Sequence, residues 1–391
     1  MPATIVVGDL HLRSRGERAA ADALVEVLRG APDSPLVLAG DGLDLAAEPV
    51  ETPAEAVEHT LGTAPELCRL LAERASRGVA TTFVAGNHDQ AVTRPDVLRA
   101  IHELLGLEGE HRAHVRSEPW FTSLAGGLVH VEHGHVFDPD SAPSHPLAPE
   151  HRDDVGICLL RDFIVPIDGY QFVHRNAEPP LPLLMRVFRT YGPKAPWVIG
   201  LYVWMATRTS LLSGGRFPLV DDRAEGTRRL TDYARSMEMD EETLRLLLEA
   251  HATPTRARST DTFLRLYLDR VFATCAIVGG GGAAVGGALL GQPALAGVGA
   301  RVATMGVLAL AASIVIKLDR YGGRAQRMLA AGAERAAEIT GARTVVLGHV
   351  HVDASGPSYQ NTASFAFPAG FDGRRPFLRV QEDGTVERGL V

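Results

Sequence analysis

Five short apolar segments of this 391-residue chain each end in side chains that bind divalent metal ions. The endings contain carboxylates, imidazoles and one amide but no thiolate, a composition that suits borderline ions such as Mn²⁺, Fe²⁺ or Zn²⁺. The sequence therefore predicts a site for divalent ions and not a structural cysteine–zinc site. The segments are IVVGDLH with Asp9 and His11, LVLAGDGLD with Asp41 and Asp44, FVAGNHD with Asn87, His88 and Asp89, VHVEHGH with His133 and His135, and VVLGHVH with His349 and His351.

The charge balance of such a site indicates its chemistry. Two divalent ions carry four positive charges, and Asp9 and Asp41 return only two negative charges if the imidazoles are neutral. The remaining positive charge would hold a bridging hydroxide and a phosphate oxygen. Two ions about 3.5–4 Å apart generate hydroxide near neutral pH and stabilise an in-line displacement. The predicted reaction is hydrolysis of a phosphate bond.

Strand-like and helix-like segments alternate in the first third of the chain, and strand-like segments return near its end. Such alternation is typical of a layered α/β core, in which ligands bind beyond the carboxyl ends of the strands. We therefore expect one α/β domain formed from residues 1–150 and 324–391. Its expected strands are 4–9, 35–41, 81–89, 114–124, 127–135, 342–351, 358–365 and 375–382, and its expected helices are 17–30, 53–78, 94–106 and 323–341.

Residues 151–323 differ in composition and predict a helical insertion between the fourth and fifth endings. Thirty uncharged residues separate Arg270 from Arg301, and fifteen more precede Lys317. Because a bilayer core needs about 20 apolar residues per helix, a hydrophobic hairpin at about 271–316 would enter a membrane and return the chain to its starting side. Glycines weaken a helix, which counts against stable membrane-spanning helices. The alternative is a Gly- and Ala-rich helical pair buried in a soluble protein.

A shorter apolar run, APWVIGLYVWMA at 195–206, cannot span a bilayer. It contains Trp197, Tyr202 and Trp204, and such a mixture is typical of a membrane interface. The run is equally compatible with a helix in the core of a soluble protein.

Composition excludes several classes of protein. The formal net charge of −8 gives no basic footprint, so no nucleic-acid partner is expected. Cys68, Cys158 and Cys275 are an odd number without CxxC spacing, which indicates a reducing compartment. The N-terminus has no basic segment and is not expected to be a signal peptide. The glycine-rich run CAIVGGGGAAVGG is not followed at the required distance by an acidic residue, which argues against a dinucleotide-binding loop.

The five endings resemble the motifs of the calcineurin-like metallophosphoesterase superfamily, which are D-x-H, G-D, G-N-H-[DE], a later H and G-H-x-H. The resemblance covers roughly residues 1–150 and 325–391. It implies an α/β fold in which two mixed sheets form a sandwich flanked by helices, with an α-helical insertion between the fourth and fifth motifs. The Asn361 of QNTASF is expected to be structural.

The resemblance also implies a role for each site residue. One ion would be bound by Asp9, His11 and His351. The other would be bound by Asn87, His133 and His349, with Asp41 bridging the two. His88 would contact the phosphate and protonate the leaving group, and Asp89 would orient the ring of His88. His135 and Asp44 would lie behind the metal ligands or contact the substrate.

Departures from the family motifs narrow the range of activities that can be expected. The Ser/Thr protein phosphatases of this superfamily continue the second motif with Arg-Gly, which GDGLDLA lacks, so protein phosphatase activity is not expected. The lipid-precursor UDP-diacylglucosamine hydrolases begin with a similar DLHL and carry a helical insertion. Those enzymes usually have Arg where His88 stands, and their insertion is much shorter.

The leading hypothesis is a binuclear phosphoesterase, with Mn²⁺ as the expected ion and Fe²⁺ or Zn²⁺ as alternatives. It would hydrolyse a lipid-linked or amphiphilic phosphate ester or pyrophosphate. It would be anchored in the inner or cytoplasmic membrane, with its catalytic domain facing the cytoplasm. One alternative is a soluble cytoplasmic phosphodiesterase or phosphatase for nucleotides or small molecules. Another is a non-enzymatic scaffold with the same fold, although such proteins tend to lose metal ligands.

Overall fold

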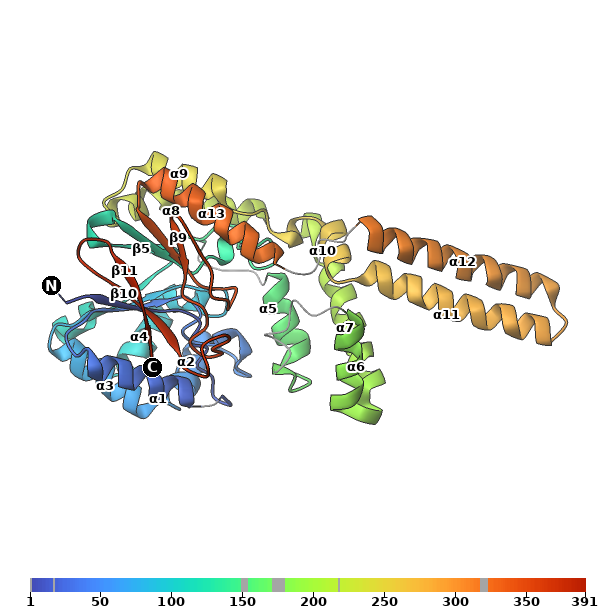
Figure 1. The fold of residues 1–391 in the computed structure, drawn as a ribbon, viewed down its shortest axis with the longest axis horizontal. Helices are drawn as coiled ribbons and strands as arrows, with labels where there is room; N and C mark the ends of the chain where they lie inside the picture. Colours follow the sequence, from blue (N-terminus) through green and yellow to red (C-terminus); the bar gives the residue numbers. More distant parts are fainter. Residues whose placement is uncertain (1, 17, 149–153, 171–179, 217–218, 317–322) are drawn as a thin grey trace. The chain divides into compact units, whose positions relative to one another are not determined.

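The computed structural model describes the chain except for residues 1, 17, 149–153, 171–179, 217–218 and 317–322 (Figure 1). The chain divides into two compact units. These units divide the chain at residues other than the predicted domain boundaries of 150 and 323. The predicted boundaries therefore stay a prediction. The first unit comprises Met1–Arg161, Pro218–Pro254 and Ala325–Val391, and the second comprises Asp162–Phe217 and Thr255–Arg324.

The first unit contains two mixed sheets. In the larger sheet β1, β2, β3 and β4 are parallel, and β10 and β11 continue it as antiparallel strands beside β1. In the smaller sheet β6, β7 and β9 are parallel, with β5 and β8 antiparallel at its edges. The strands are β1 (Thr4–Val7), β2 (Leu36–Ala39), β3 (Thr81–Val84), β4 (Val115–Glu118), β5 (Phe121–Leu124), β6 (Val129–Glu132), β7 (Thr344–Leu347), β8 (Ser355–Gly356), β9 (Tyr359–Asn361), β10 (Pro376–Val380) and β11 (Val386–Leu390).

The two sheets pack face to face through valines. Val6 and Val37 from the larger sheet lie in one buried cluster with Val129, Val131 and Val346 from the smaller sheet. Strands buried on both faces read as apolar runs without alternation, which explains the segments IVV, LVLA and VVL. The predicted α/β sandwich of two mixed sheets flanked by helices is confirmed.

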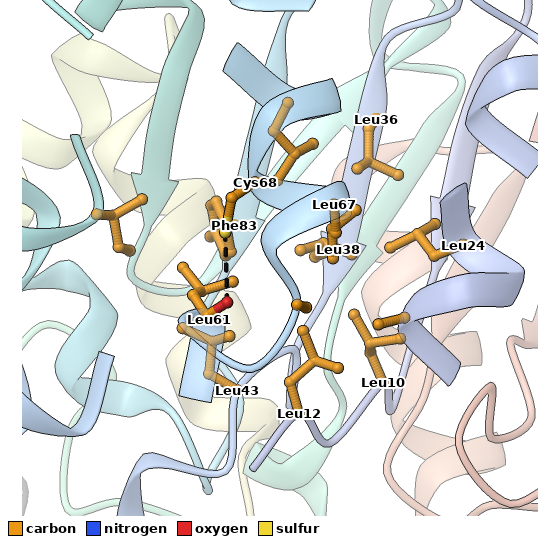
Figure 2. Close-up of a cluster of buried hydrophobic side chains, with 14 of the residues drawn as sticks. Leu10, Leu12, Leu24, Leu36, Leu38, Leu43, Leu61, Leu67, Cys68 and Phe83 are labelled. Atoms are coloured by element: carbon orange, nitrogen blue, oxygen red, sulfur yellow. Dashed lines mark hydrogen bonds between the residues drawn. The ribbon is translucent and has the colours of Figure 1, made fainter. Parts of the chain in front are cut away.

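The outer face of the larger sheet is covered by four helices, α1 (Ala19–Gly30), α2 (Pro53–Leu61), α3 (Pro65–Ser76) and α4 (Pro95–Leu104). Figure 2 shows part of this core, where Leu38 of β2 and Phe83 of β3 lie in one cluster with Leu24 of α1. The Cys68 thiol donates to the Leu61 carbonyl at 3.3 Å. Helix α2 begins where the sequence places a Thr-Pro pair and a glutamate, since the Thr52 and Glu55 side chains form a capping box.

The outer face of the smaller sheet is covered by α8 (Leu219–Ser236), α9 (Glu241–Ala250) and α13 (Arg324–Thr340). The Tyr233 hydroxyl of α8 donates to the Phe121 carbonyl of β5 at 3.1 Å, which ties the helix to the sheet edge. Residues 219–250 fall inside the predicted insertion, yet they pack on the catalytic sheet. A polar helix with one apolar stripe can pack on the sheet or belong to a separate insertion. The sequence alone therefore did not decide where residues 219–250 lie.

This helical layer covers the buried His145 and the half-buried His251, which predicts a pH-dependent stability. The His251 ring lies edge-on to Trp120 at 4.9 Å between centroids. Burial, reinforced by the neighbouring His145 and His130, lowers the pKa of His251 to about 3, and burial lowers that of His145 to about 4. The unfolded chain binds these protons near pH 6.5 and the folded chain does not. Stability is therefore full above about pH 6.5 and falls as the pH drops toward these lowered values.

Urea unfolding of chelator-treated protein measures this effect. Between pH 7.5 and 5.5 the free energy of unfolding of H251F should fall by about 1.4 kcal/mol less than that of the wild type, because one proton-uptake site is removed. The exposed His59 provides the matched control H59F, which should follow the wild type. Equal pH slopes for H251F and the wild type would contradict a neutral His251.

The second unit contains α6 (Pro180–Tyr191), α7 (Ala195–Leu211), α10 (Ser259–Arg265), α11 (Leu268–Leu289) and α12 (Pro293–Ile316). Helices α11 and α12 form an antiparallel hairpin (Figure 1). Backbones meet at Gly280 and Gly287 of α11 and at Gly299 and Gly306 of α12. A Cβ on any of these four residues would lie within 2.8 Å of the facing backbone. The seven-residue spacing of each pair keeps both glycines on the face that contacts the other helix. This contact between α11 and α12 is called the shared seam.

Both hairpin helices are long enough and apolar enough to cross a membrane. In their most apolar 18-residue windows only 17% of α11 and 11% of α12 is buried. Outside the shared seam, Val278, Leu289, Met305 and Val315 are at least 69% exposed. Most of the hairpin surface outside the seam is therefore exposed within its own unit, and the choice between a membrane hairpin and a helical pair in a soluble protein stays a prediction.

Candidate metal centre

Parallel pairing brings the five sequence endings to one place. Strands β1, β2 and β3 are parallel neighbours in the larger sheet, and β6 and β7 are parallel neighbours in the smaller sheet. Their carboxyl ends are followed by the predicted site residues. The His349 backbone N–H donates to both Asp9 carboxylate oxygens, at 3.2 and 3.1 Å, which joins the two sheets at the site. All eleven predicted site residues lie in one connected network of contacts.

The first candidate ligand group is Asp9, His11 and His351. The His351 Nε2 lies 3.0 Å from Asp9 Oδ1 and 3.2 Å from His11 Nε2. Two imidazole nitrogens and a carboxylate oxygen that converge in this way fit a shared cation. Asp9 and His351 are separated by more than 300 residues in sequence, so only the folded chain creates this group.

The second candidate group centres on His133 and Asp41. The His133 Nε2 lies 3.2 Å from Asp41 Oδ2 and 3.2 Å from Asn87 Oδ1. The His133 Nδ1 is 3.2 Å from the Ala39 carbonyl, to which it donates. That hydrogen bond leaves the lone pair on Nε2, as a metal ligand requires. Asp41, Asp9 and His133 also form a potential metal-binding group.

One carboxylate faces both groups. Asp41 Oδ2 lies 3.2 Å from His133 Nε2 and 3.9 Å from His11 Nε2. The other oxygen, Oδ1, accepts the His88 backbone N–H at 2.9 Å. The carboxylate at the end of β2 therefore faces a histidine of each group, and its bridging role stays a prediction.

The backbone at the site is strained. Asp9, His11, Asp41, His349 and His351 all have positive φ angles between 46° and 70°. Residues other than glycine rarely adopt this left-handed region, and such outliers cluster at functional sites. Glycines allow the close approach: a Cβ at Gly86 would lie 2.2 Å from Asp41 Oδ1, and one at Gly40 would lie 2.3 Å from the His133 ring.

The imidazole of His88 is oriented by Asp44. Its Nδ1 forms a short hydrogen bond with Asp44 Oδ1. The other oxygen of Asp44 lies 3.5 Å from His11 Nδ1, so one fully buried carboxylate contacts two site histidines. The sequence placed Asp44 only behind the ligands or at the substrate, and the structure assigns it this specific contact.

The expectation that Asp89 orients the His88 ring is wrong. Asp89 accepts backbone N–H groups instead, from Gly42 at 2.7 Å, Leu43 at 3.1 Å and Gly86 at 2.7 Å. Consecutive side chains in this loop point in different directions, so adjacency in sequence did not produce contact. Asp89 holds the second and third motif loops together.

Charge is tightly balanced in this pocket. Burial by itself raises the pKa of Asp41, but the imidazoles of His133, His88 and His11 bring it well below its ordinary value. Burial likewise lowers the pKa of His88, and Asp41 and Asp44 raise it to about 10. The buried carboxylates are therefore ionised and stabilise positive charge beside them, whether that charge is an imidazolium or a cation.

The remaining predicted residues are also accounted for. The His349 ring lies edge-on to His133 at 5.2 Å between centroids, and the His135 ring lies 5.3 Å from His133. Asn361 donates to the Gly348 carbonyl at 2.7 Å and so supports the loop that carries His349. The roles of His349 and His135 toward a metal or substrate stay predictions.

Sequence reasoning missed Asp138. Its Oδ2 lies 3.1 Å from the Nε2 of His349. The residue follows the HGH segment by only three positions, so an acidic residue close behind the fourth ending was a usable signal. Asp138 either orients His349 from behind or adds an oxygen donor to the pocket.

The fold and the pocket are those of a calcineurin-like phosphoesterase, and sequence comparison agrees. The family model for calcineurin-like phosphoesterases matches residues 3–199, about half of the chain. The chain belongs to the calcineurin-like phosphoesterase family, and the resemblance noted from its motifs is confirmed. No curated protein matches the chain in the search made. The family generally hydrolyses phosphoesters and usually binds two divalent metal ions.

The residues present fit such ions. The converging donors are nitrogen and oxygen atoms, and Asp9 and Asp41 supply buried negative charge between imidazoles. Among the described residues, potential metal-binding groups of three or more His, Cys, Asp or Glu occur at this pocket alone.

Proposed function

We propose that the chain is a metal-dependent hydrolase of phosphate esters or pyrophosphates. The observation that carries the proposal is the position of Asp41, whose Oδ2 faces both His133 and His11, which belong to two adjoining potential metal-binding groups. Divalent ions in such a site supply a hydroxide nucleophile and stabilise the charge that develops on the phosphate. The chain's own residues position these ions and provide the proton for the leaving group.

The residues divide into three roles. His88 donates a proton to the leaving oxygen, because its ring is held by Asp44 and its Nε2 remains available for the substrate. Asp44 fixes the geometry of this acid. Asp9, His11 and His351 would hold the first ion, Asn87, His133 and His349 would hold the second, and Asp41 would be shared between them.

Metal analysis combined with turnover tests this function. Protein stripped with a chelator and reloaded with Mn²⁺, Fe²⁺ or Zn²⁺ should bind about two ions per chain. It should regain hydrolysis of bis-p-nitrophenyl phosphate, p-nitrophenyl phosphate or a pyrophosphate. Stoichiometric metal without turnover on any of these substrates would favour the scaffold alternative, and failure to bind metal would overturn the site.

We further propose that the catalytic unit works at the cytoplasmic face of a membrane on a lipid-linked or amphiphilic phosphate. Support comes from the hairpin: 22 and 24 helical residues extend about 33 and 36 Å, enough for a hydrocarbon core of about 30 Å. Near the open end of the hairpin, the Ser313 hydroxyl donates to Asp269 at 2.6 Å and accepts from Arg270 at 3.1 Å. This polar cluster would lie at the near headgroup layer.

Cys275 offers a direct test of insertion. It is exposed on α11, whereas Cys68 and Cys158 are buried. In intact membranes a membrane-impermeant maleimide should label Cys275 at least tenfold less than after denaturation in SDS, because lipid covers it. The variant C275S gives the background from the two buried thiols. Carbonate should leave the protein in the membrane fraction.

The opposite result supports the soluble alternative. Release of the protein by carbonate without detergent, together with rapid labelling of Cys275, would show that the hairpin does not insert. The enzyme would then be a soluble phosphodiesterase or phosphatase for a nucleotide or another small molecule. Metal binding and turnover would be unaffected by this outcome.

A further inference from the structure

An exposed apolar face runs along α7. Trp197, Trp204 and Leu211 recur every seven residues, so they share one face of the helix. They are 58%, 56% and 61% exposed. A neighbouring face of α7, about 100° around the helix, packs inside the second unit through Val198 and Met205, which are buried. Helix α7 therefore has one face that packs within the unit and another face that stays exposed.

Helix α6 extends this apolar surface. Met185 and Phe188 are 53% and 48% exposed, and α6 packs against α7 (Figure 1). Together, Met185, Phe188, Trp197, Trp204 and Leu211 are called the aromatic face. Contiguous exposed apolar side chains on a protein surface commonly mark a site that contacts a partner or a membrane.

Basic side chains border the aromatic face. Arg189 and Lys194 are exposed at the end of α6 and the start of α7. The Arg208 guanidinium lies 5.9 Å from the centre of the Trp204 ring and 3.0 Å from Asp162. Aromatic rings next to Lys and Arg are the composition found where proteins meet lipid headgroups.

The aromatic face belongs to the same packed unit as the root of the hairpin. The Tyr202 hydroxyl of α7 donates to the Leu266 carbonyl at 2.8 Å, two residues before α11 begins. Helix α7 also packs against α10 and α11. If the hairpin spans a bilayer, its root lies at the headgroup layer, and α7 is held at that depth by this hydrogen bond.

Formal charge is divided between the two units. Of the chain's 39 Lys and Arg, 14 lie in the second unit, but only 6 of its 47 Asp and Glu do. The second unit thus has a formal charge of +8, in a chain whose total is −8. A cationic unit in an acidic protein is complementary to an anionic lipid surface, which attracts basic residues that lie close to it.

We propose that the aromatic face of α6 and α7 lies in the headgroup layer of an anionic bilayer and holds the second unit against it. This inference rests on the proposed membrane location and adds a second, charge-dependent contact to the hairpin. The rings of Trp197 and Trp204 enter the upper acyl region, and the basic side chains contact lipid phosphates. A substrate carried by lipid would be presented at the same surface.

The tryptophans allow a direct measurement, because the chain has only three and the third, Trp120, is buried in the first unit. The full chain is reconstituted into vesicles of phosphatidylethanolamine and phosphatidylglycerol that contain a lipid brominated near the headgroup. Emission should fall by about half or more relative to vesicles without bromine. The variant W197F/W204F, which emits from Trp120 alone, should lose this quenching.

The charge contribution is measured separately. In R189Q/K194Q, quenching in vesicles that contain phosphatidylglycerol should drop toward the level in pure phosphatidylcholine vesicles. Unquenched tryptophans in protein whose Cys275 is protected would overturn the aromatic face while leaving the inserted hairpin intact. Quenching that is independent of phosphatidylglycerol and unchanged in R189Q/K194Q would overturn the anionic-lipid contact. Exposed Cys275 without quenching would overturn both proposals.

Discussion

Replacing Asp41 by Asn is expected to lower kcat/KM for phosphoester hydrolysis at least roughly 1000-fold, on the order of 4 kcal/mol of transition-state stabilisation. One Asp41 oxygen faces His133 at 3.2 Å and His11 at 3.9 Å, so the substitution removes negative charge from both ligand groups at once. Asn keeps the shape of the side chain and tolerates the positive φ of 50° at this position. Bound metal should fall from about two ions to one or fewer, measured by elemental analysis.

The matched control for this substitution is D33N. Asp33 is exposed and pairs with Arg77 at the surface, so its loss should leave activity and metal content unchanged. Circular dichroism of D41N should match that of the wild type. A D41N enzyme that retains activity within tenfold of the wild type, with two bound ions, would refute the bridging role of Asp41.

Replacing His88 by Gln is expected to lower kcat by about 100- to 10,000-fold for esters with poor leaving groups, the usual range for loss of a general acid. Burial opposes the imidazolium, but in the metal-free chain the carboxylates of Asp41 and Asp44 raise the pKa of His88 to about 10, and the Asp44 contact does not depend on the metal ligands. Because p-nitrophenolate leaves without protonation, H88Q should lose far less activity on p-nitrophenyl esters. The dependence of rate on leaving-group pKa is the measurement.

Two further variants separate the acid from its support. D44N should show a smaller loss with the same leaving-group pattern, because it weakens the hydrogen bond that holds the His88 ring. D89N should instead lower stability, because its carboxylate accepts backbone N–H groups from three loop residues. Equal losses of H88Q on activated and unactivated esters, with bound metal unchanged, would rule out proton donation by His88.

Much of the catalytic unit could be predicted from the sequence. Apolar runs that stop at Asp9, Asp41 and Asn87 predict strands with functional ends, because buried parallel strands need continuous apolar residues and their ends face solvent at a common edge. The order of the five endings was sufficient to indicate the family. The hairpin was visible for the same kind of reason, since length and apolarity are local properties of a segment.

Side-chain partners required the tertiary structure. His88 is followed directly by Asp89, yet its ring pairs with Asp44 from the preceding motif. Asp138 reaches His349 across more than 200 residues of sequence. Spacing along a chain shows which residues arrive at a sheet edge, but backbone dihedrals and packing determine where each side chain points, and the positive φ angles at this site are not encoded by residue type.

The sequence by itself therefore determined the metal-binding residue types, their positions at strand ends and the presence of two long apolar helices. The tertiary structure decided that α8 and α9 cover the catalytic sheet, that Asp44 holds His88, and that Trp197 and Trp204 share an exposed face on a helix bound to the hairpin root. The physical reason is the separation along the chain of the residues that determine each property. Periodicity and composition are properties of neighbouring residues, whereas exposure and contact depend on which distant segments the fold brings together.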